Sequence, residues 1–386
     1  MRPLGRARPS LLRHLNERQV LAAIQSRGPQ SRADIMRSTG ISGPTVTRAV
    51  QTLLDAGLLE EGDFRHAGRG RPSKALRLAG TSVCVLGAVV GPARCEVVSS
   101  GLDGRIRPNR RAFDTPPTYP GLINAFASHI EKLAAEGKTT VLGLGVSIPG
   151  LLHGEEKRTV LSPNLHQTDG RQIGKDLADR TGLETVPMQE MDCLCLAERM
   201  YGHARNVEDF AMLDLSDGLG VGFVHKGQIL EGHSGLAGEL GHVTIQLDGR
   251  PCGCGNRGCL ETVATDTALL HGISERLGRR LTMDEMLAGV RSGSIVPGPE
   301  FEEVLQYLAV GLAAAVNLFN PRMLFVYGRF FDADSGLFAR LVELTKKRAL
   351  GPSMAECEII RAQIDKSQGA IAAVMHHITA GWEGAA

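Results

Sequence analysis

The chain has 386 residues, of which 42% are hydrophobic and 22% charged, and its net charge at pH 7 is +1. This length predicts two or three domains with buried cores, and eight cysteines in so long a chain exclude a disulfide-stapled scaffold. The sequence shows neither a signal peptide nor an apolar run of the ~18 residues that a membrane-spanning helix requires, so a cytoplasmic location is expected.

The charge is divided unevenly along the chain. Residues 1–80 contain 14 lysines and arginines against 6 acidic residues, a net charge of +8, which leaves −7 for the other residues. Such asymmetry indicates an N-terminal segment that binds nucleic acid, attached to a nearly neutral body.

Three short helices are predicted in this N-terminal segment. The second opens with the capping-box pattern Ser31 to Asp34, and the third is capped by Ser42 and stops at Gly57. Apolar side chains recur at helical spacing in the first and third helices, at Val20, Leu21, Ile24, Val46, Val50, Leu53 and Leu54. The order helix, helix, tight turn, helix is that of a helix-turn-helix.

The start of the third helix carries side chains that suit DNA. Thr45, Thr47 and Arg48 offer small hydroxyls and a bidentate donor to base edges and phosphates in a major groove. A hairpin is expected next, and its loop holds Arg69 and Arg71 beside glycines, which suits a minor groove. Residues 1–80 are therefore interpreted as a winged helix-turn-helix that binds double-stranded operator DNA. The alternative is a three-helix packing module with a solvated basic loop.

Residues 81–386 alternate between strand and helix patterns, which predicts an α/β body. A long helix is expected over 301–319, and its inner face holds Leu305, Leu308, Leu312, Val316 and Phe319. The main segments are a hairpin over 83–100, a third strand over 104–113, a helix over 120–135, a buried strand ending in a loop over 140–150, a strand, glycine turn and strand over 211–230, and that long helix. The helix over 120–135 is expected to bury Leu122, Phe126, Ile130 and Leu133.

One histidine and three cysteines follow one another in a glycine-rich stretch. They are His242, Cys252, Cys254 and Cys259. Tetrahedral zinc takes four nitrogen or thiolate ligands, and four protein ligands close its coordination sphere, so one structural zinc ion per chain is predicted. The alternative is free or disulfide-bonded cysteines, but a Cys-x-Cys pair cannot easily bridge itself.

Four motifs resemble those of the ROK family, named for its repressors, open reading frames and sugar kinases. They are "SIPG" at 147–150, "GLGVG" at 218–222, "AGELGH" at 237–242 and "CGCGNRGCLE" at 252–261. The resemblance implies a two-lobed actin-like ATPase fold with a sugar in its cleft, braced by zinc on the same four ligands. It also implies Glu239, His242 and Glu261 as contacts to sugar hydroxyls, in agreement with acceptors held on a rigid loop. Asn164 resembles a further hydroxyl contact, although a lone asparagine in a loop is about as often a turn former.

The chain departs from the kinase members of that family where phosphate chemistry is done. Kinases carry Asp-x-Gly-x-Thr in the first hairpin, whereas residues 89–93 here read Val-Val-Gly-Pro-Ala. Asp217 stands in the second glycine turn, where its charge opposes a phosphate. Gln189 and Glu190 stand where kinases have Asn and the general base Asp, and a shift of ~1 Å in a reacting group can cost about a hundredfold in rate. Binding of a hydroxyl by Glu190 survives this change better than catalysis does.

The sequence therefore predicts a sugar-responsive transcriptional regulator, a repressor that acts as a homodimer or homotetramer and is not an enzyme. The alternatives are a sugar kinase with a DNA-binding head and a regulator whose body has lost its ligand and serves only in assembly.

Overall fold

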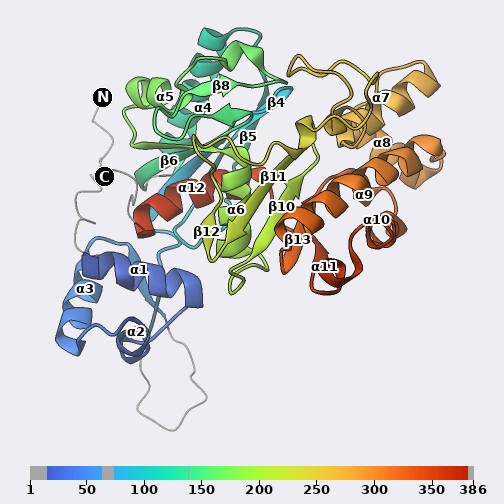
Figure 1. Cartoon of the computed structure of the whole chain (residues 1–386). Helices are drawn as coiled ribbons and strands as arrows, with labels where there is room; N and C mark the ends of the chain where they lie inside the picture. Colours follow the sequence, from blue (N-terminus) through green and yellow to red (C-terminus); the bar gives the residue numbers. More distant parts are fainter. Residues whose placement is uncertain (1–14, 63–73, 138, 381–386) are drawn as a thin grey trace. The chain divides into compact units, whose positions relative to one another are not determined.

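The computed structural model describes residues 15–62, 74–137 and 139–380, which form two compact units (Figure 1). The first unit consists of the described residues up to Ile148, of Gln172–Tyr201 and of Lys366 onward. The second consists of Pro149–Arg171 and Gly202–Asp365. The chain thus leaves the first unit and returns to it twice, and each unit is described by itself below.

The chain begins with a small helical head followed by a hairpin. Ser31 and Asp34 form the predicted capping box, and Gly40 ends the second helix in the left-handed conformation with φ of 72°. Ser42 occupies the predicted N-cap position of the third helix. Its hydroxyl makes no capping hydrogen bond, however, and lies 2.8 Å from the hydroxyl of Thr45. The helix-turn-helix and its antiparallel hairpin are confirmed. The elements are α1 (Leu15–Arg27), α2 (Arg32–Thr39), α3 (Gly43–Asp55), β1 (Leu59–Gly62) and β2 (Ala75–Leu78).

The first unit contains a five-stranded sheet in the order β5-β4-β3-β6-β9. The pairs β3–β6 and β6–β9 are parallel, and the other pairs are antiparallel. Helix α12 packs against β3, β6 and α6, while α4 packs against α5 and β4. The elements are β3 (Val83–Val89), β4 (Arg94–Ser100), β5 (Arg111–Asp114), α4 (Tyr119–Glu136), β6 (Thr140–Ile148), α5 (Ile173–Thr181), β9 (Thr185–Gln189), α6 (Glu190–Tyr201) and α12 (Lys366–Ala380).

The second unit is built on another five-stranded sheet, in the order β12-β11-β10-β13-β14. Strands β10, β13 and β14 run parallel, and β11 and β12 continue antiparallel. Its strands are β7 (Leu151–Leu152), β8 (Thr159–Leu161), β10 (Phe210–Asp214), β11 (Gly220–His225), β12 (Gln228–Ile229), β13 (Met323–Tyr327) and β14 (Glu358–Arg361). Its helices are α7 (Asp266–Leu277), α8 (Met283–Ser292), α9 (Pro299–Phe319), α10 (Gly336–Lys346) and α11 (Gly351–Ala355). The α/β architecture of the body is thereby confirmed.

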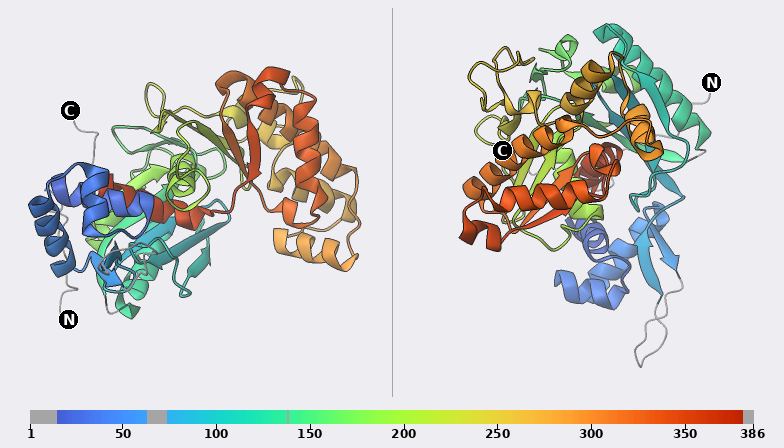
Figure 2. Two further views of the ribbon diagram at one scale, coloured as in Figure 1. Left: turned by 90° about the horizontal axis from the view of Figure 1, so that it is seen from below. Right: turned by 90° about the vertical axis from the view of Figure 1, so that its right-hand side faces the viewer.

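Helix α9 is the central core helix of the second unit and runs beside α10 (Figure 2). It is the one described helix long and apolar enough to cross a membrane, and 56% of its most apolar window is buried inside the unit. Its predicted inner face is confirmed at Leu305, Leu308, Leu312 and Val316. The prediction is wrong for Phe319, which is 44% exposed because the helix ends there, although its ring stacks on Phe223 at 3.5 Å between centroids.

The helical head shares one hydrophobic core with the sheet of the first unit. Val20, Leu21 and Ile24 of α1 belong to the same buried cluster as Ile371 and Val374 of α12. Between β2 and β3, the amides of Gly80 and Thr81 donate to the Glu60 carboxylate at 3.1 and 3.2 Å. The head is therefore packed onto the first unit, and its position depends on the position of α12.

Replacement of Leu21 by alanine tests this shared core. Leu21 is fully buried, and a Leu→Ala change in a core costs about 2–5 kcal/mol of stability, so Leu21→Ala is expected to lower the melting temperature of head and first unit together. Leu15→Ala in the same helix is the control, because Leu15 is 69% exposed. Thermal unfolding followed by circular dichroism checks the difference, and equal melting curves for the two variants would contradict it.

A candidate metal centre beside a polar site

One histidine and three cysteines of the second unit converge on one point. A ligand atom from each of His242, Cys252, Cys254 and Cys259 lies within 4.8 Å of the others. His242 ends a short 3-10 turn, Leu240–His242, and Cys259 directly precedes another, Leu260–Thr262. An isolated antiparallel β-bridge pairs Thr244 with Cys259. The predicted ligand set is thus brought together by a local loop.

The spacing of these atoms matches a tetrahedral ion. Bonds of about 2.3 Å to sulfur and about 2.0–2.1 Å to nitrogen place two sulfurs about 3.8 Å apart and a sulfur and a nitrogen about 3.6 Å apart. The Sγ atoms of Cys254 and Cys259 are 3.7 Å apart, and Sγ of Cys252 is 3.6 Å from Nδ1 of His242. The residues therefore fit one metal ion held by three sulfurs and one nitrogen.

The chemistry of the cysteines supports a metal over a disulfide. All eight cysteines, which lie in the described part of the chain, are free, and the 3.7 Å between Cys254 and Cys259 far exceeds a disulfide bond of about 2.05 Å. Burial raises the pKa of the Cys252 and Cys259 thiols. A cation reverses this effect, because it binds the thiolate and stabilises the negative charge.

The glycines of the loop are required by close packing. A Cβ on Gly258, whose φ is 69°, would lie 1.6 Å from the carbonyl oxygen of Gln246. A Cβ on Gly253 would lie 2.1 Å from the carbonyl oxygen of Pro163. Any side chain at these two positions would push the loop apart, so the glycines allow the cysteines to converge.

A group of polar side chains adjoins the cluster. Nδ1 of His242 points toward Cys252, and its Nε2 lies 3.6 Å from Oε2 of Glu239. Glu261 lies 3.8 Å from Nδ1 through Oε1 and accepts the Leu219 N–H through Oε2 at 3.3 Å. Burial, together with the nearby charge of Glu261, raises the pKa of Glu239 to about 7. One side of the histidine thus faces the metal position and the other a carboxylate.

Asn164 belongs to the same group. Its Nδ2 lies 3.4 Å from the carbonyl oxygen of Asp217, and a Cβ on Gly218 would lie 3.0 Å from that Nδ2 and 2.9 Å from Glu261 Oε2. Four of the five residues expected to contact a sugar, Asn164, Glu239, His242 and Glu261, are therefore neighbours around the turn that follows β10.

The fifth, Glu190, belongs to the first unit. It is the first residue of α6, and its Oε1 lies 3.0 Å from Nζ of Lys366. Lys366 was not predicted as its partner, because it lies 176 positions further along the chain and outside the family motifs. The position of Lys366 at the start of α12 is the one feature that indicates a partner, since a cation at a helix N-terminus needs a nearby negative charge.

The turns after β10 and after β3, whose motifs depart from the kinase pattern, make contacts within the protein. In the turn after β10, the Leu219 N–H donates to Glu261, and the Thr267 hydroxyl donates to the carbonyls of Ser216 and Asp217 at 3.2 and 3.4 Å. In the turn after β3, Val89 is buried and the Gly91 carbonyl accepts the Thr115 hydroxyl at 2.7 Å. These contacts add to the loss of the acid and the hydroxyl from the first hairpin.

Three of the five residues expected to contact DNA, Thr45, Thr47 and Arg48, are described by the structure, and they lie on the first turns of α3. Thr47 and Arg48 are exposed, and Thr45 is half-buried. The Thr47 hydroxyl donates to the Gly43 carbonyl at 2.9 Å, which leaves its lone pairs open to a donor. Arg69 and Arg71 lie outside the described residues.

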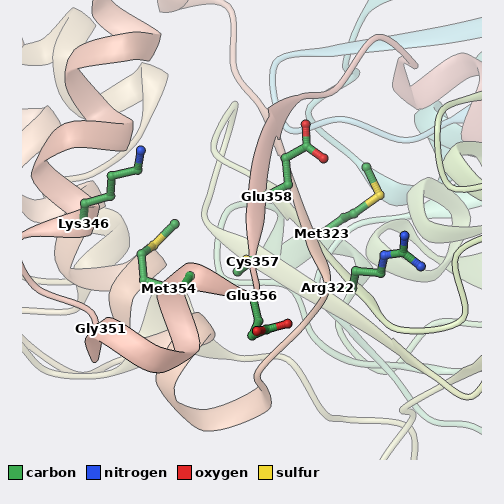
Figure 3. A pocket seen from close by; sticks show the side chains of 9 residues that line it. Arg322, Met323, Lys346, Gly351, Met354, Glu356, Cys357 and Glu358 are labelled. Carbon is green, nitrogen blue, oxygen red and sulfur yellow. The ribbon is translucent and has the colours of Figure 1, made fainter.

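A hollow of about 670 Å³ lies elsewhere in the second unit (Figure 3). Its walls include Met323 of β13 and Glu358 of β14, which are at the amino ends of these parallel strands. Ligands of α/β sheets bind at the carboxyl ends, where the turn after β10 and the polar group are found. The hollow is therefore separate from the candidate site.

Two family models match the chain. The model of the ROK family matches residues 85–378, and the model of the MarR family matches residues 14–70. The first match covers the sheets, the cysteine cluster and the polar group, and the second covers the helical head.

Curated relatives and solved structures resemble the chain over most of its length. It is 24% identical to the DNA-binding transcriptional dual regulator NagC of Escherichia coli K12, over 95% of this chain and 93% of that protein. It is 26% identical to the xylose repressor of Bacillus subtilis 168, over 81% and 82%.

Among structures, a ROK family transcriptional regulator, described as a homolog of the E. coli MLC protein, superposes with a TM-score of 0.78 at 23% identity, over 97% of this chain and 98% of that one. A ROK family glucokinase from Streptomyces griseus, in complex with glucose and AMPPNP, superposes with a TM-score of 0.69 at 22% identity, over 75% and 97%. The body therefore has the fold of both regulators and kinases.

Proposed function

Because the chain belongs to the ROK family, we propose that it is a transcriptional repressor that binds operator DNA through its head and a sugar through its body. It uses the sugar as an effector and does not phosphorylate it. The observation that carries this proposal is a complete winged helix-turn-helix joined to a body whose phosphate-facing turns lack the kinase residues.

The comparisons support a regulator over a kinase. NagC and the ROK family transcriptional regulator match 95% and 97% of the chain, head included, whereas the glucokinase structure matches only three quarters of it. Phosphoryl transfer consists mostly of positioning and charge neutralisation. Here Asp217 adds negative charge beside the phosphate turn, and the Leu219 amide already donates to Glu261.

The sugar would be held by acceptors and donors fixed by the loop. Glu239 and Glu261 would accept from hydroxyls, and Asn164 and Nε2 of His242 would bind others. Glu190 is proposed as a further hydroxyl contact. All five have polar atoms suited to a polyol. Because His242 faces Cys252 with Nδ1, its Nε2 is available for a hydroxyl while the other nitrogen binds a metal.

Zinc is the ion that best suits His242, Cys252, Cys254 and Cys259. One histidine and three cysteines in a closed tetrahedral set are typical of a structural zinc site, in which the ion stabilises the loop and activates no water. We therefore propose one zinc ion per chain, which fixes the positions of Glu239 and Glu261.

A single head contacts one half-site, so tight operator binding requires at least a homodimer, or a homotetramer, on an inverted repeat. Like its regulator relatives, the protein would act on DNA in the cytoplasm.

The first prediction concerns the metal. Elemental analysis of the purified chain is expected to find one zinc ion per chain, and Cys254→Ser is expected to lose most of it, because a hydroxyl is a poor substitute for a thiolate ligand. Cys357→Ser is the control, since Cys357 is free and not one of the four clustered ligands. Full zinc content in Cys254→Ser, or well under one ion in the folded wild type, would contradict the assignment.

The second prediction concerns base recognition. Arg48→Ala is expected to reduce discrimination at one base pair by about 1–3 kcal/mol, because an arginine on this turn of α3 suits a bidentate base contact. Arg37→Ala is the control, since the Arg37 guanidinium is paired with Asp34. Arg69→Ala and Arg71→Ala are expected to weaken binding at A/T-rich flanks. In vitro selection of DNA with each variant measures these effects, and an unchanged base preference in Arg48→Ala would count against this contact.

The third prediction separates a regulator from a kinase. The ligands tested by thermal shift are N-acetylglucosamine, named in a further relative, the N-acetylglucosamine repressor of Escherichia coli O6:H1, which is 24% identical, D-xylose, named in the xylose repressor, and D-glucose, bound in the glucokinase structure. A sugar at a hundred times its Kd stabilises the folded state by about 2.7 kcal/mol, and this shift is expected for the wild type and lost in Glu239→Ala. Asp248→Ala, an exposed carboxylate of the same loop, is expected to keep it.

In the same samples, ATP consumption is expected to stay at background, and operator affinity is expected to change saturably with the sugar whether or not ATP is present. Steady formation of sugar phosphate that is abolished by Glu190→Gln would instead establish a kinase with a DNA-binding head.

A further inference from the structure

The ion pair of Lys366 and Glu190 joins the starts of two helices in the first unit. Lys366 is the first residue of α12 and Glu190 the first residue of α6, with 3.0 Å between Nζ and Oε1. The two side chains are only 15% and 14% exposed. Charges so shielded from water attract each other more strongly than a surface pair does.

The two charges are not equally suited to their positions. The N-terminus of a helix favours a negative charge and disfavours a positive one. Glu190 is therefore stabilised by α6, whereas the charge of Lys366 is opposed by its own helix and is compensated in part by the carboxylate of Glu190. A ligand that competes for this carboxylate acts first on the start of α12.

Helix α12 lies directly against its neighbours (Figure 1). A Cβ on Gly145 of β6 would lie 1.9 Å from the carbonyl oxygen of Ala370, and a Cβ on Gly369 would lie 3.2 Å from Cβ of Cys193 in α6. Close-packed interiors transmit a displacement. A shift at the start of α12 is therefore passed along the helix.

The later turns of the same helix reach the core of the head. Ile371, Val374, Met375 and Ile378 of α12 are buried in one cluster with Val20, Leu21 and Ile24 of α1. One helix thus begins at a carboxylate expected to bind the sugar and ends against the DNA-binding head.

We propose that Lys366 is the positioning residue that couples occupation of Glu190 to the DNA-binding head. This inference rests on the proposed function. A sugar hydroxyl that donates to Glu190 takes over part of the carboxylate that Lys366 uses, so the ammonium group and the first turn of α12 change position. Helix α12 then shifts against α1, and the effect on DNA is set by the difference in sugar affinity between the two positions of the helix.

The test compares two variants in α12 of the full-length protein. Lys366→Met removes the charge and keeps the length of the side chain. His377→Gln is the matched control. His377 lies on a later turn of α12 and pairs with Glu184 rather than Glu190, with 2.7 Å between Nε2 and Oε1. The DNA is a duplex selected in vitro from random sequence by the wild type, and the probes are N-acetylglucosamine, D-xylose and D-glucose.

The readout is the ratio of the operator Kd with and without saturating sugar, with sugar binding followed separately by calorimetry. Allosteric coupling changes affinity by about 5- to 150-fold, and a wild-type ratio in this range is expected. Lys366→Met is expected to bind both operator and sugar but with a ratio close to one. His377→Gln and Lys366→Arg, which keeps the charge, are expected to retain the wild-type ratio.

The outcomes distinguish the inference from the proposed function. A wild-type ratio in Lys366→Met overturns the coupling role alone, and so does a ratio of one in His377→Gln, because general loosening of α12 would then be sufficient. A wild-type protein that binds none of the three sugars, or whose ratio is one with all of them, contradicts the proposed function and this inference with it. If Lys366→Met does not fold, Lys366→Gln, which carries no charge, decides by the same ratio.

Discussion

The carboxylate of Glu261 is the contact on which the candidate site depends. One oxygen lies beside Cys252 and His242, at 3.1 and 3.8 Å, and the other accepts the Leu219 N–H. The loop of clustered cysteines and the glycine turn after β10 are thereby fixed to each other by a single side chain. In a kinase the amides of such a turn would be needed for phosphate, so the contact that organises the polar side also occupies the phosphate side.

A second constraint concerns the head, whose core is continuous with that of the first unit. Its buried side chains continue into α12 and the sheet of the first unit without interruption. A head on a loose linker would bind DNA regardless of events in the body, whereas a head packed on α12 responds to any displacement of that helix. The shared core therefore makes communication between ligand and DNA physically possible, and the buried pair at the start of α12 gives it a point of origin.

The sequence predicted best those features that are local along the chain. The cluster of His242 and the three cysteines lies within 18 residues, and its glycines indicated the tight loop that brings the ligands together. The capping box of Ser31 and the inner faces of α4 and α9 also followed from short-range patterns. The prediction is wrong for Phe319, because periodicity identifies a helix face but not the residue at which the neighbouring layer ends.

Features that join distant segments could not be predicted. Periodicity indicates that Val20 is buried but not that it shares a core with Val374 of α12. Likewise, no pattern connects Glu190 with Lys366, since the pairing arises only when the chain returns to the first unit after residue 365. This return makes the last helix part of the same unit as the head. A sugar that is bound without turnover can act only through a difference in affinity between two arrangements of the protein. Helix α12 is the element proposed to move, because it contacts Glu190 at its start and the core of the head further along.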